Sequence, residues 1–352
     1  MTEDRNSHDG KKRQRRPSLR DVGLRAGVAV SSASRALAGH PDVNPETRDR
    51  VLKAAGELGY ERNMLAEGLR SGATHTVGFV ARDIGGYGLG EIASGAEHML
   101  SHRAYSVLLT SSRDDPRLDV DRISLLEQRR VDGLLLLLAS DDHEPTLARI
   151  RKLGVPFVLI DRDPPPDLEC AAVVCDHRSG ARTAIAHLAE LGHRHIGLAA
   201  GPTHLRPGRE NIAGVTLGAE ELGLELSIEL GTFTARHGED ATERMLKLDD
   251  PPTAIVAGSH DIAVGVLRAL QTHGLRVPDD MSLVTNDALA ALGFVDPPLA
   301  VIAFRPRLLG ERAAHMLLGM LDGAPPTQEL LPTFFDPRSS CSSPAASRRV
   351  AT

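Results

Sequence analysis

The chain has 352 residues, of which 41% are hydrophobic and 25% charged, enough for two or three domains with buried cores. Its three cysteines, Cys170, Cys175 and Cys341, form no CxxC pair, which argues against disulfides and structural zinc and favours a cytoplasmic location. We find neither a secretion signal nor an apolar run of the ~18 residues that a membrane span needs.

The net charge of −6 conceals two parts of opposite sign. Residues 1–72 hold 14 Lys and Arg against 10 Asp and Glu, a net charge of +4, whereas the remaining residues carry −10. A basic head on an acidic body indicates a polyanionic partner for the head alone. Charge by itself leaves open that the basic residues 11–16 form only a solvated tail.

The first 72 residues contain three predicted helices. Residues 1–17 are polar and charged, which predicts a disordered basic arm. Apolar spacing around a glycine turn at Gly27 then predicts two short helices over residues 19–26 and 31–37, a helix-turn-helix candidate. A third helix is expected over residues 45–58, with Asn44 as its cap, Pro45 in first position and Gly59 at its end.

From residue 76 onward, short apolar runs alternate with helical stretches, which predicts parallel sheets covered by helices. Ten strands are expected, at residues 76–81, 105–110, 133–138, 157–160, 172–175, 196–200, 227–231, 254–257, 282–286 and 301–303. They predict an α/β core of two doubly wound subdomains with a cleft between them. We assign residues 73–172 and 304–335 to the first subdomain and residues 173–303 to the second. Residues 336–352, rich in Ser, Pro and Ala, are expected to be a disordered tail.

Several sequence blocks resemble the LacI/GalR family of transcriptional repressors. In the headpiece they are Asp21-Val22, Ala26-Gly27-Val28, Ser34-Arg35-Ala36-Leu37, Pro45-Glu46-Thr47-Arg48, Leu58-Gly59-Tyr60 and Leu69-Arg70-Ser71-Gly72. In the core they include Leu191-Gly192-His193, Gly201-Pro202, Val277-Pro278-Asp279 and Asp296-Pro297-Pro298-Leu299. The resemblance implies a helix-turn-helix domain over residues 18–62 and a hinge helix over residues 63–72. It also implies an effector-binding and dimerisation core over residues 73–335, with a fold like that of periplasmic sugar-binding proteins.

The resemblance makes residues 29–37 a recognition helix for the major groove of DNA. It implies that Arg35 donates to guanine, that Ser32 and Ser34 contact phosphates, and that Leu69 wedges between base pairs. The full set of implied DNA-binding residues is Val30, Ser31, Ser32, Ser34, Arg35, Asn44, Ala66 and Leu69. Arg35 and the serines could instead face water on a solvated helix surface.

Four departures from the family pattern lie in the DNA-binding region. Glu67 places a negative charge near phosphates, and Gly68 weakens the hinge helix beside the leucine wedge. Ala29 replaces the usual serine at the start of the recognition helix, and Ala38 replaces the usual asparagine. We expect these changes to lower the affinity for DNA without abolishing binding.

The resemblance also implies an effector site in the cleft, with Arg209 holding effector oxygens and Phe233 stacking on the effector ring. The family's effector-binding aspartate falls on His260, and Arg82 is expected to join the site from a strand end. These donors indicate a sugar or sugar derivative, with an acidic or phosphorylated effector as one form. Arg82 and His260 could instead bind surface carboxylates.

Two further segments of the expected cleft depart from the family pattern. The usual Asn-Pro-Phe-Phe is replaced by Gly86-Tyr87-Gly88-Leu89, and the usual Gly-Phe-Asp-Asp by Thr285-Asn286-Asp287-Ala288. We therefore expect a pocket whose chemistry differs from that of the family at large.

Three other functions have partial support in the sequence. Gly88-Leu89-Gly90-Glu91-Ile92-Ala93 fits the GxGxxA pattern of a nucleotide-dependent oxidoreductase, but about six residues separate it from the preceding strand. His193 and His195 could hold a metal, yet no nearby ligand completes the set. A solute-binding protein would explain the cleft but not the headpiece. We predict a non-enzyme without cofactor or metal, acting as a homodimer on palindromic DNA.

Overall fold

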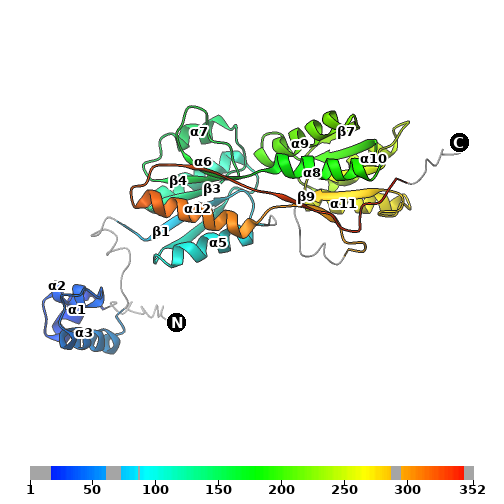
Figure 1. Cartoon of the computed structure of the whole chain (residues 1–352). Helices are drawn as coiled ribbons and strands as arrows, with labels where there is room; N and C mark the ends of the chain where they lie inside the picture. Colours follow the sequence, from blue (N-terminus) through cyan, green and yellow to red (C-terminus); the bar gives the residue numbers. More distant parts are fainter. Residues whose placement is uncertain (1–16, 61–72, 86–87, 287–294, 345–352) are drawn as a thin grey trace, which may run out of the picture. The chain divides into compact units, whose positions relative to one another are not determined.

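The structure is a computed structural model of the whole chain, and the residues that it describes are 17–60, 73–85, 88–286 and 295–344. The chain forms two compact units, residues 1–74 and residues 75–352 (Figure 1). The expected basic arm, up to residue 16, and the expected hinge helix at residues 63–72 lie outside the described residues.

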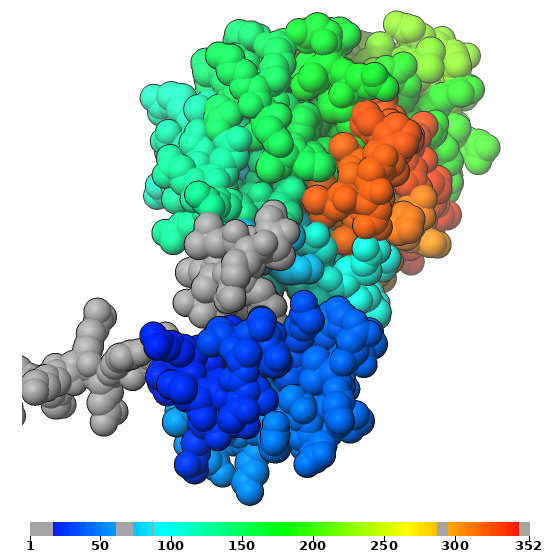
Figure 2. Space-filling view, turned by 90° about the vertical axis from the view of Figure 1, so that its left-hand side faces the viewer, coloured from blue at the N-terminus to red at the C-terminus, as the bar shows by residue number. Residues whose placement is uncertain are grey.

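The headpiece contains the three predicted helices, α1 (Leu19–Ala26), α2 (Val30–Leu37) and α3 (Pro45–Leu58), blue in Figure 2. Gly27 ends α1 at a φ of 67°, a left-handed conformation that glycine adopts without steric cost, and this turn sends the chain directly into α2. The helices bury a shared apolar core whose members include Val22, Ala33, Ala36 and Val51. The helix-turn-helix prediction is confirmed.

The core contains two six-stranded sheets. The first has the order β11-β5-β4-β3-β1-β2, and its strands are all parallel. They are β1 (Thr76–Ala81), β2 (Ser106–Ser111), β3 (Gly133–Leu137), β4 (Phe157–Ile160), β5 (Ala171–Cys175) and β11 (Gln328–Leu331). The second sheet has the order β12-β10-β9-β8-β6-β7, and β12 alone runs antiparallel, against β10. Its strands are β6 (His195–Ala200), β7 (Glu225–Leu230), β8 (Ala254–Ala257), β9 (Ser282–Asn286), β10 (Ala300–Ala303) and β12 (Phe334–Asp336).

Helices cover both faces of each sheet, as the alternation of apolar runs and helical stretches predicts (Figure 1). On the first sheet, α5 (Leu89–Ser101) and α12 (Pro306–Leu321) lie on one face, and α6 (Pro116–Gln128) and α7 (Glu144–Ile150) on the other. On the second sheet, α8 (His177–Glu190) and α9 (Arg206–Leu222) face α10 (Ala235–Leu246) and α11 (His260–Thr272) across the strands. Among the described helices, none is long and apolar enough to cross a membrane.

The boundary between the two subdomains differs from the sequence prediction. Strand β5 pairs with β4 and β11, so the first subdomain extends through Cys175 and does not end at residue 172. Near the C-terminus, β11 belongs to the first sheet but β12 to the second, so the chain crosses between sheets at Thr333. The sequence did not predict β11 and β12. Both are short, and only their pairing with β5 and with β10 identifies them as strands.

The expected tail of residues 336–352 is corrected over its first part. Residues 336–344 are packed along the second sheet, and Ser340 is fully buried. The Ser340 hydroxyl donates to the carbonyl oxygen of Leu283 at 2.5 Å and accepts from the amide of Ala300 at 2.7 Å. Polar composition suggested disorder, but here the serines satisfy buried backbone groups at the edges of β9 and β10.

Replacing Ser340 with alanine should therefore destabilise the core. The Ser340→Ala variant leaves one buried carbonyl and one buried amide without the hydroxyl, which costs ~1–3 kcal/mol of the free energy of unfolding. Urea unfolding of the full-length protein measures this difference. The exposed Ser343→Ala serves as control and should match the wild type, and equal stabilities for all three proteins would contradict the packed tail.

Candidate DNA-binding surface and ligand pocket

Helix α2 carries the exposed side chains of the headpiece that the sequence assigns to DNA. Its inner positions, Ala33 and Ala36, are buried in the headpiece core. Ser31 and Arg35, four residues apart on one helix face, are exposed, and Val30 is 42% exposed. The Arg35 guanidinium forms no ion pair with any described residue. Helix α2 therefore leaves Val30, Ser31 and Arg35 available to an outside partner.

The other predicted DNA-binding residues have different surroundings. Ser32 and Ser34 are half-buried along the sides of α2. Asn44 is exposed, and its side-chain oxygen accepts from the amide of Glu46 at 2.9 Å, so it caps α3 as predicted. Four residues discussed above lie outside the described residues: Ala66, Glu67, Gly68 and Leu69.

The start of α2 lacks a side-chain cap. Ala29 occupies the capping position and supplies no hydrogen bond to the first turn of the helix. Backbone amides at a helix start attract anions when no side chain occupies them. The serine-to-alanine departure therefore leaves these amides to solvent or to a phosphate group.

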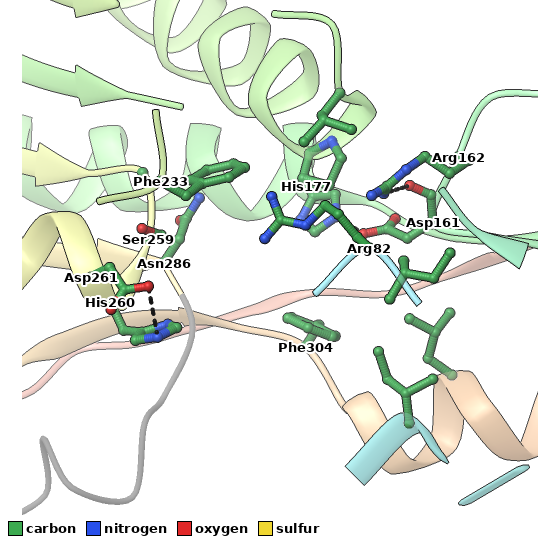
Figure 3. Close-up of a pocket in the computed structure, with 16 residues that line it drawn as sticks. Arg82, Asp161, Arg162, His177, Phe233, Ser259, His260, Asp261, Asn286 and Phe304 are labelled. Carbon is green, nitrogen blue, oxygen red and sulfur yellow. Dashed lines mark hydrogen bonds and ion pairs between the residues drawn. The ribbon is translucent and has the colours of Figure 1, made fainter. Parts of the chain in front are cut away.

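A pocket lies between the two sheets of the core, with an empty volume of about 830 Å³ that includes the open solvent at its mouth (Figure 3). Strand ends build its walls. Arg82 follows β1 and Asp161 follows β4 in the first subdomain, while Ser259 follows β8 and Asn286 ends β9 in the second. In each sheet, successive strands are added first on one side of the starting strand and then on the other, so the strand order switches between β1 and β3 and between β6 and β8. Proteins of the α/β class bind ligands at such switch points.

Phe233 and Arg82 meet across this pocket. The Arg82 guanidinium carbon lies 5.4 Å from the centroid of the Phe233 ring, within the range of a cation–π contact (Figure 3). Gly201 makes room for the ring, since a Cβ atom there would fall 2.1 Å from it. Arg82 also forms an ion pair with Asp114 at 3.2 Å. The two residues therefore link the subdomains through one contact.

A buried carboxylate lies at the back of the pocket. Asp161 accepts from the Cys175 amide at 3.0 Å and pairs with the His177 ring at 2.8 Å. Burial alone would raise the pKa of Asp161, but His177, the Cys175 amide and Arg162 outweigh it and lower the pKa to about 2. Arg162 in turn donates to the carbonyl oxygen of Leu138 at 2.7 Å. Asp161 is therefore a charged group held in place by protein partners on several sides.

An ionic cluster joins the two subdomains beside the pocket. We use this name for Arg206 and Arg209 of α9 with Asp141 and Asp163, which follow β3 and β4. One Arg209 nitrogen lies 2.7 Å from a carboxylate oxygen of Asp141 and 2.6 Å from one of Asp163. Arg206 contacts Asp163 at 2.9 Å and donates to the carbonyl oxygen of Cys175 at 2.6 Å. The side chain of Asp141 is only 5% exposed, so this carboxylate depends on its arginine partners.

The pocket brings together three of the four predicted effector residues: Arg82, Phe233 and His260. Arg209 is not among the described residues that line it, because Asp141 and Asp163 hold its guanidinium in the ionic cluster. His260 lies 3.4 Å from Asp261, so the alternative in which Arg82 and His260 bind carboxylates also has support in the structure.

The lining residues that the sequence did not predict include Asp161, Arg162, His177 and Phe304, whereas Asn286 lies in a segment already expected in the cleft. The signal for the first two was present, because they directly follow the apolar run of residues 157–160, and strand ends are where ligand sites form. His177 and Phe304 lie where the chain passes from one sheet to the other, with ring centroids 6.0 Å apart. No sequence spacing brings those two segments together.

The histidines considered for metal binding have protein partners. One ring nitrogen of His193 lies 2.7 Å from the Thr253 hydroxyl oxygen, and the other 3.0 Å from that of Ser282. His195 contacts the Ser227 hydroxyl at 2.8 Å. These bonds give His193 a structural role in the second sheet. The second ring nitrogen of His195 has no hydrogen-bond partner among the described residues, and His195, Glu225 and Asp250 each place a possible metal-ligand atom within 4.8 Å of the others, so the fold supplies the acidic neighbours that the sequence did not predict.

The chain thus combines a helix-turn-helix headpiece with a two-subdomain core that forms a pocket between its strand ends. This arrangement defines a DNA-binding regulator that senses a small molecule.

Comparisons with known proteins give the family. The sequence profile of the lacI family of bacterial regulatory proteins matches residues 18–63, and that of a periplasmic binding protein-like domain matches residues 185–341. The chain is 31% identical over 317 residues to the HTH-type transcriptional repressor CytR of Escherichia coli (strain K12), with 89% of this chain and 92% of the relative covered. The chain belongs to the lacI family, and its relatives are repressors and not enzymes, which replaces the oxidoreductase alternative.

Solved structures agree with this assignment. The Lac repressor dimer bound to operator and the anti-inducer ONPF matches with a TM-score of 0.84 at 26% identity, covering 93% of this chain and 100% of that one. A complex of the transcriptional regulator CelR with cellobiose matches with a TM-score of 0.71 at 28% identity, covering 92% and 100%. The chain is therefore a DNA-binding repressor of this family, regulated by an effector.

Removing the charge of Asp161 should reveal the pH dependence of its contribution to stability. A carboxyl whose folded pKa is about 2, against an ordinary value of 3.8, stabilises the native state fully above pH ~4 and loses this effect as the pH falls toward 2. We expect Asp161→Asn to cost about 2 kcal/mol at pH 7, and the difference from the wild type to shrink below pH 4. Urea unfolding between pH 7 and pH 3 measures it, with the exposed Asp249→Asn as control. A difference that grew with acidity would contradict the assigned contacts.

Removing Arg209 should loosen the contact between the subdomains. Burial already raises the pKa of Asp141, so without the Arg209 guanidinium this carboxyl takes up a proton more readily. We expect Arg209→Gln to lose ~1–3 kcal/mol of stability and to increase the radius of gyration in small-angle scattering. Arg178→Gln is the matched control, because its partner Glu210 lies in the same subdomain. Equal scattering from both variants would show that Arg209 does not hold the cleft.

Proposed function

We propose that the chain is a transcriptional repressor that binds a palindromic operator as a homodimer and changes its operator affinity when a small molecule occupies the core pocket. The observation that carries this proposal is the exposed face of α2, where Val30, Ser31 and Arg35 have no competing role in the headpiece core. Two such helices related by a two-fold axis would enter successive major grooves. The Lac repressor structure that this chain resembles is itself a dimer on its operator. Because its target is chromosomal DNA, we place the protein in the cytoplasm.

Within this proposal, each predicted DNA-binding residue has a distinct role. Arg35 reads a base, Ser32 and Ser34 contact phosphates, and the hinge residues Ala66 and Leu69 act in the minor groove. A guanidinium that can donate twice to guanine discriminates between bases, whereas a hydroxyl on a phosphate only positions the helix. Arg35 should therefore set sequence preference more strongly than its serine neighbours.

For the effector we propose a sugar or a sugar derivative. Phe233 offers an apolar ring surface, and polar groups of both subdomains surround it, a combination that suits a polar ring compound. The cellobiose complex of CelR shows a sugar bound by a relative of similar fold. The acidic or phosphorylated form was expected from Arg82, Arg209 and His260 acting together. With Arg209 engaged in the ionic cluster, that form loses one of its three donors.

The alternative, a solute-binding protein with a degenerate headpiece, has less support. A headpiece released from DNA binding would be expected to lose its core, yet Val22, Ala33 and Val51 are fully buried. The Ser18 side chain accepts from Asp21 in a capping box, and Arg48 bonds the carbonyl oxygen of His40. The first contact stabilises the start of α1, and the second ties the loop after α2 to α3.

Selection of bound sequences from a random DNA pool tests the proposal directly. The wild-type protein should enrich a palindrome, and Arg35→Ala should bind it ~10- to 100-fold more weakly and lose preference at one position of each half-site. Arg50→Ala, an exposed residue of α3 with the same loss of charge, is the control and should keep the sequence preference. Enrichment of no sequence by the wild type would favour the solute-binding alternative.

A further inference from the structure

The charged side chains of the pocket are already paired within the protein. Arg82 has Asp114 at 3.2 Å and the Phe233 ring. Arg162 is 3% exposed and donates to two backbone carbonyl oxygens at 2.7 Å each, with Asp141 at 3.4 Å. An anionic ligand would therefore meet committed guanidinium groups, and it would also approach the Asp161 carboxylate. Such an environment disfavours a phosphate or a carboxylate, because a buried charge needs a partner of its own.

Asn286 differs from these residues. It ends β9, lines the pocket beside Phe233 and Ser259, and is only 7% exposed (Figure 3). Its side-chain carbonyl oxygen is buried and accepts no hydrogen bond from any described residue. A buried acceptor without a partner costs ~1–3 kcal/mol, so proteins rarely keep one without a use.

The position of Asn286 adds to this observation. Asn286 ends β9 at the carboxyl edge of the second sheet, where α/β proteins bind ligands. An amide group therefore stands at the pocket wall. An amide oxygen accepts a hydrogen bond from an N–H or O–H group and cannot neutralise a charge.

We propose that Asn286 is a specificity-determining contact of the effector pocket, and that its side-chain oxygen accepts a hydrogen bond from an uncharged ring compound bearing hydroxyl or amine donors. Neutral sugars and nucleosides share this chemistry. The inference rests on the proposed function, since it concerns the ligand of the same pocket. It narrows the effector to the uncharged members of the class.

The experiment uses the purified full-length protein and isothermal titration with four sets of ligands: neutral mono- and disaccharides, their phosphates, nucleosides, and nucleotides. A neutral compound should bind, and its phosphorylated counterpart should bind at least ~10-fold more weakly, because the phosphate finds no uncommitted cation. Binding by a sugar or by a nucleoside identifies the source of the donor groups. Tighter binding of any phosphorylated compound than of its neutral parent would overturn the proposal.

Two variants test the role of Asn286 itself. Asn286→Leu keeps the size of the side chain but removes the acceptor, and it should weaken effector binding ~10- to 100-fold, because the effector donor is left unpaired. The unliganded variant should be at least as stable as the wild type, since the side-chain oxygen that it removes accepts no bond from any described residue. Thr285→Ser is the neighbouring control: it is buried, it keeps the hydroxyl that donates to the Asn286 backbone carbonyl oxygen at 3.0 Å, and its side chain points to the opposite face of β9.

The outcomes separate the inference from the function on which it rests. If a ligand binds and shifts operator affinity while Asn286→Leu binds it like the wild type, the inference fails and the repressor function stands. If Asn286→Leu and Thr285→Ser weaken binding equally, the effect is structural and the inference also fails. If no ligand of the four sets binds, both the inference and the proposed effector fail, while operator selection still tests the DNA-binding function separately.

Discussion

The ionic cluster between α9 and the ends of β3 and β4 is the interaction on which the core depends. Asp141 is nearly inaccessible to water, and a carboxylate so placed remains charged only while cations lie against it. Asp141 has Arg162 of its own subdomain at 3.4 Å and Arg209 of the other subdomain at 2.7 Å, and Arg206 pairs with the neighbouring Asp163. The two α9 arginines therefore tie the second subdomain to the strand ends of the first, beside the pocket. Arg209, which the resemblance assigns to the effector, thus holds the two subdomains together beside the pocket but does not line it.

The charged groups of the pocket are likewise paired within the protein. Its guanidinium groups are held by Asp114, by backbone carbonyl oxygens and by the ring of Phe233, and its buried carboxylate is held by His177. A ligand that enters can therefore improve few charge interactions but can complete hydrogen bonds that the protein leaves open. Because the walls come from two subdomains, a ligand contacting both would stabilise one relative orientation over others. Under the proposed function, such differential stabilisation would couple occupancy of the pocket to DNA binding.

The headpiece is stabilised by different interactions from those of the core. Its three short helices surround a few small apolar side chains, and local devices such as the Ser18 capping box and the Gly27 turn orient α2. Short helices gain little stability alone, so capping and the shared apolar core must supply it. Rigid presentation of α2 leaves Ser31 and Arg35 available for contact with DNA.

Local patterns in the sequence determined the elements. The helix-turn-helix follows from the spacing of Val22, Ala33 and Leu37 around Gly27, and ten of the twelve core strands that the structure describes follow from their apolar runs. The sequence also placed Arg82, Phe233 and His260 in the pocket through resemblance. Only the tertiary structure decided the rest. The two strands β11 and β12, the packed serines near Ser340 and the subdomain boundary after Cys175 depend on which segment pairs with which. The places of Arg209, His177 and Asn286 depend on contacts between residues far apart in the chain. Periodicity and capping act over a few residues, whereas the pairing of a buried charge is settled only when distant strand ends meet.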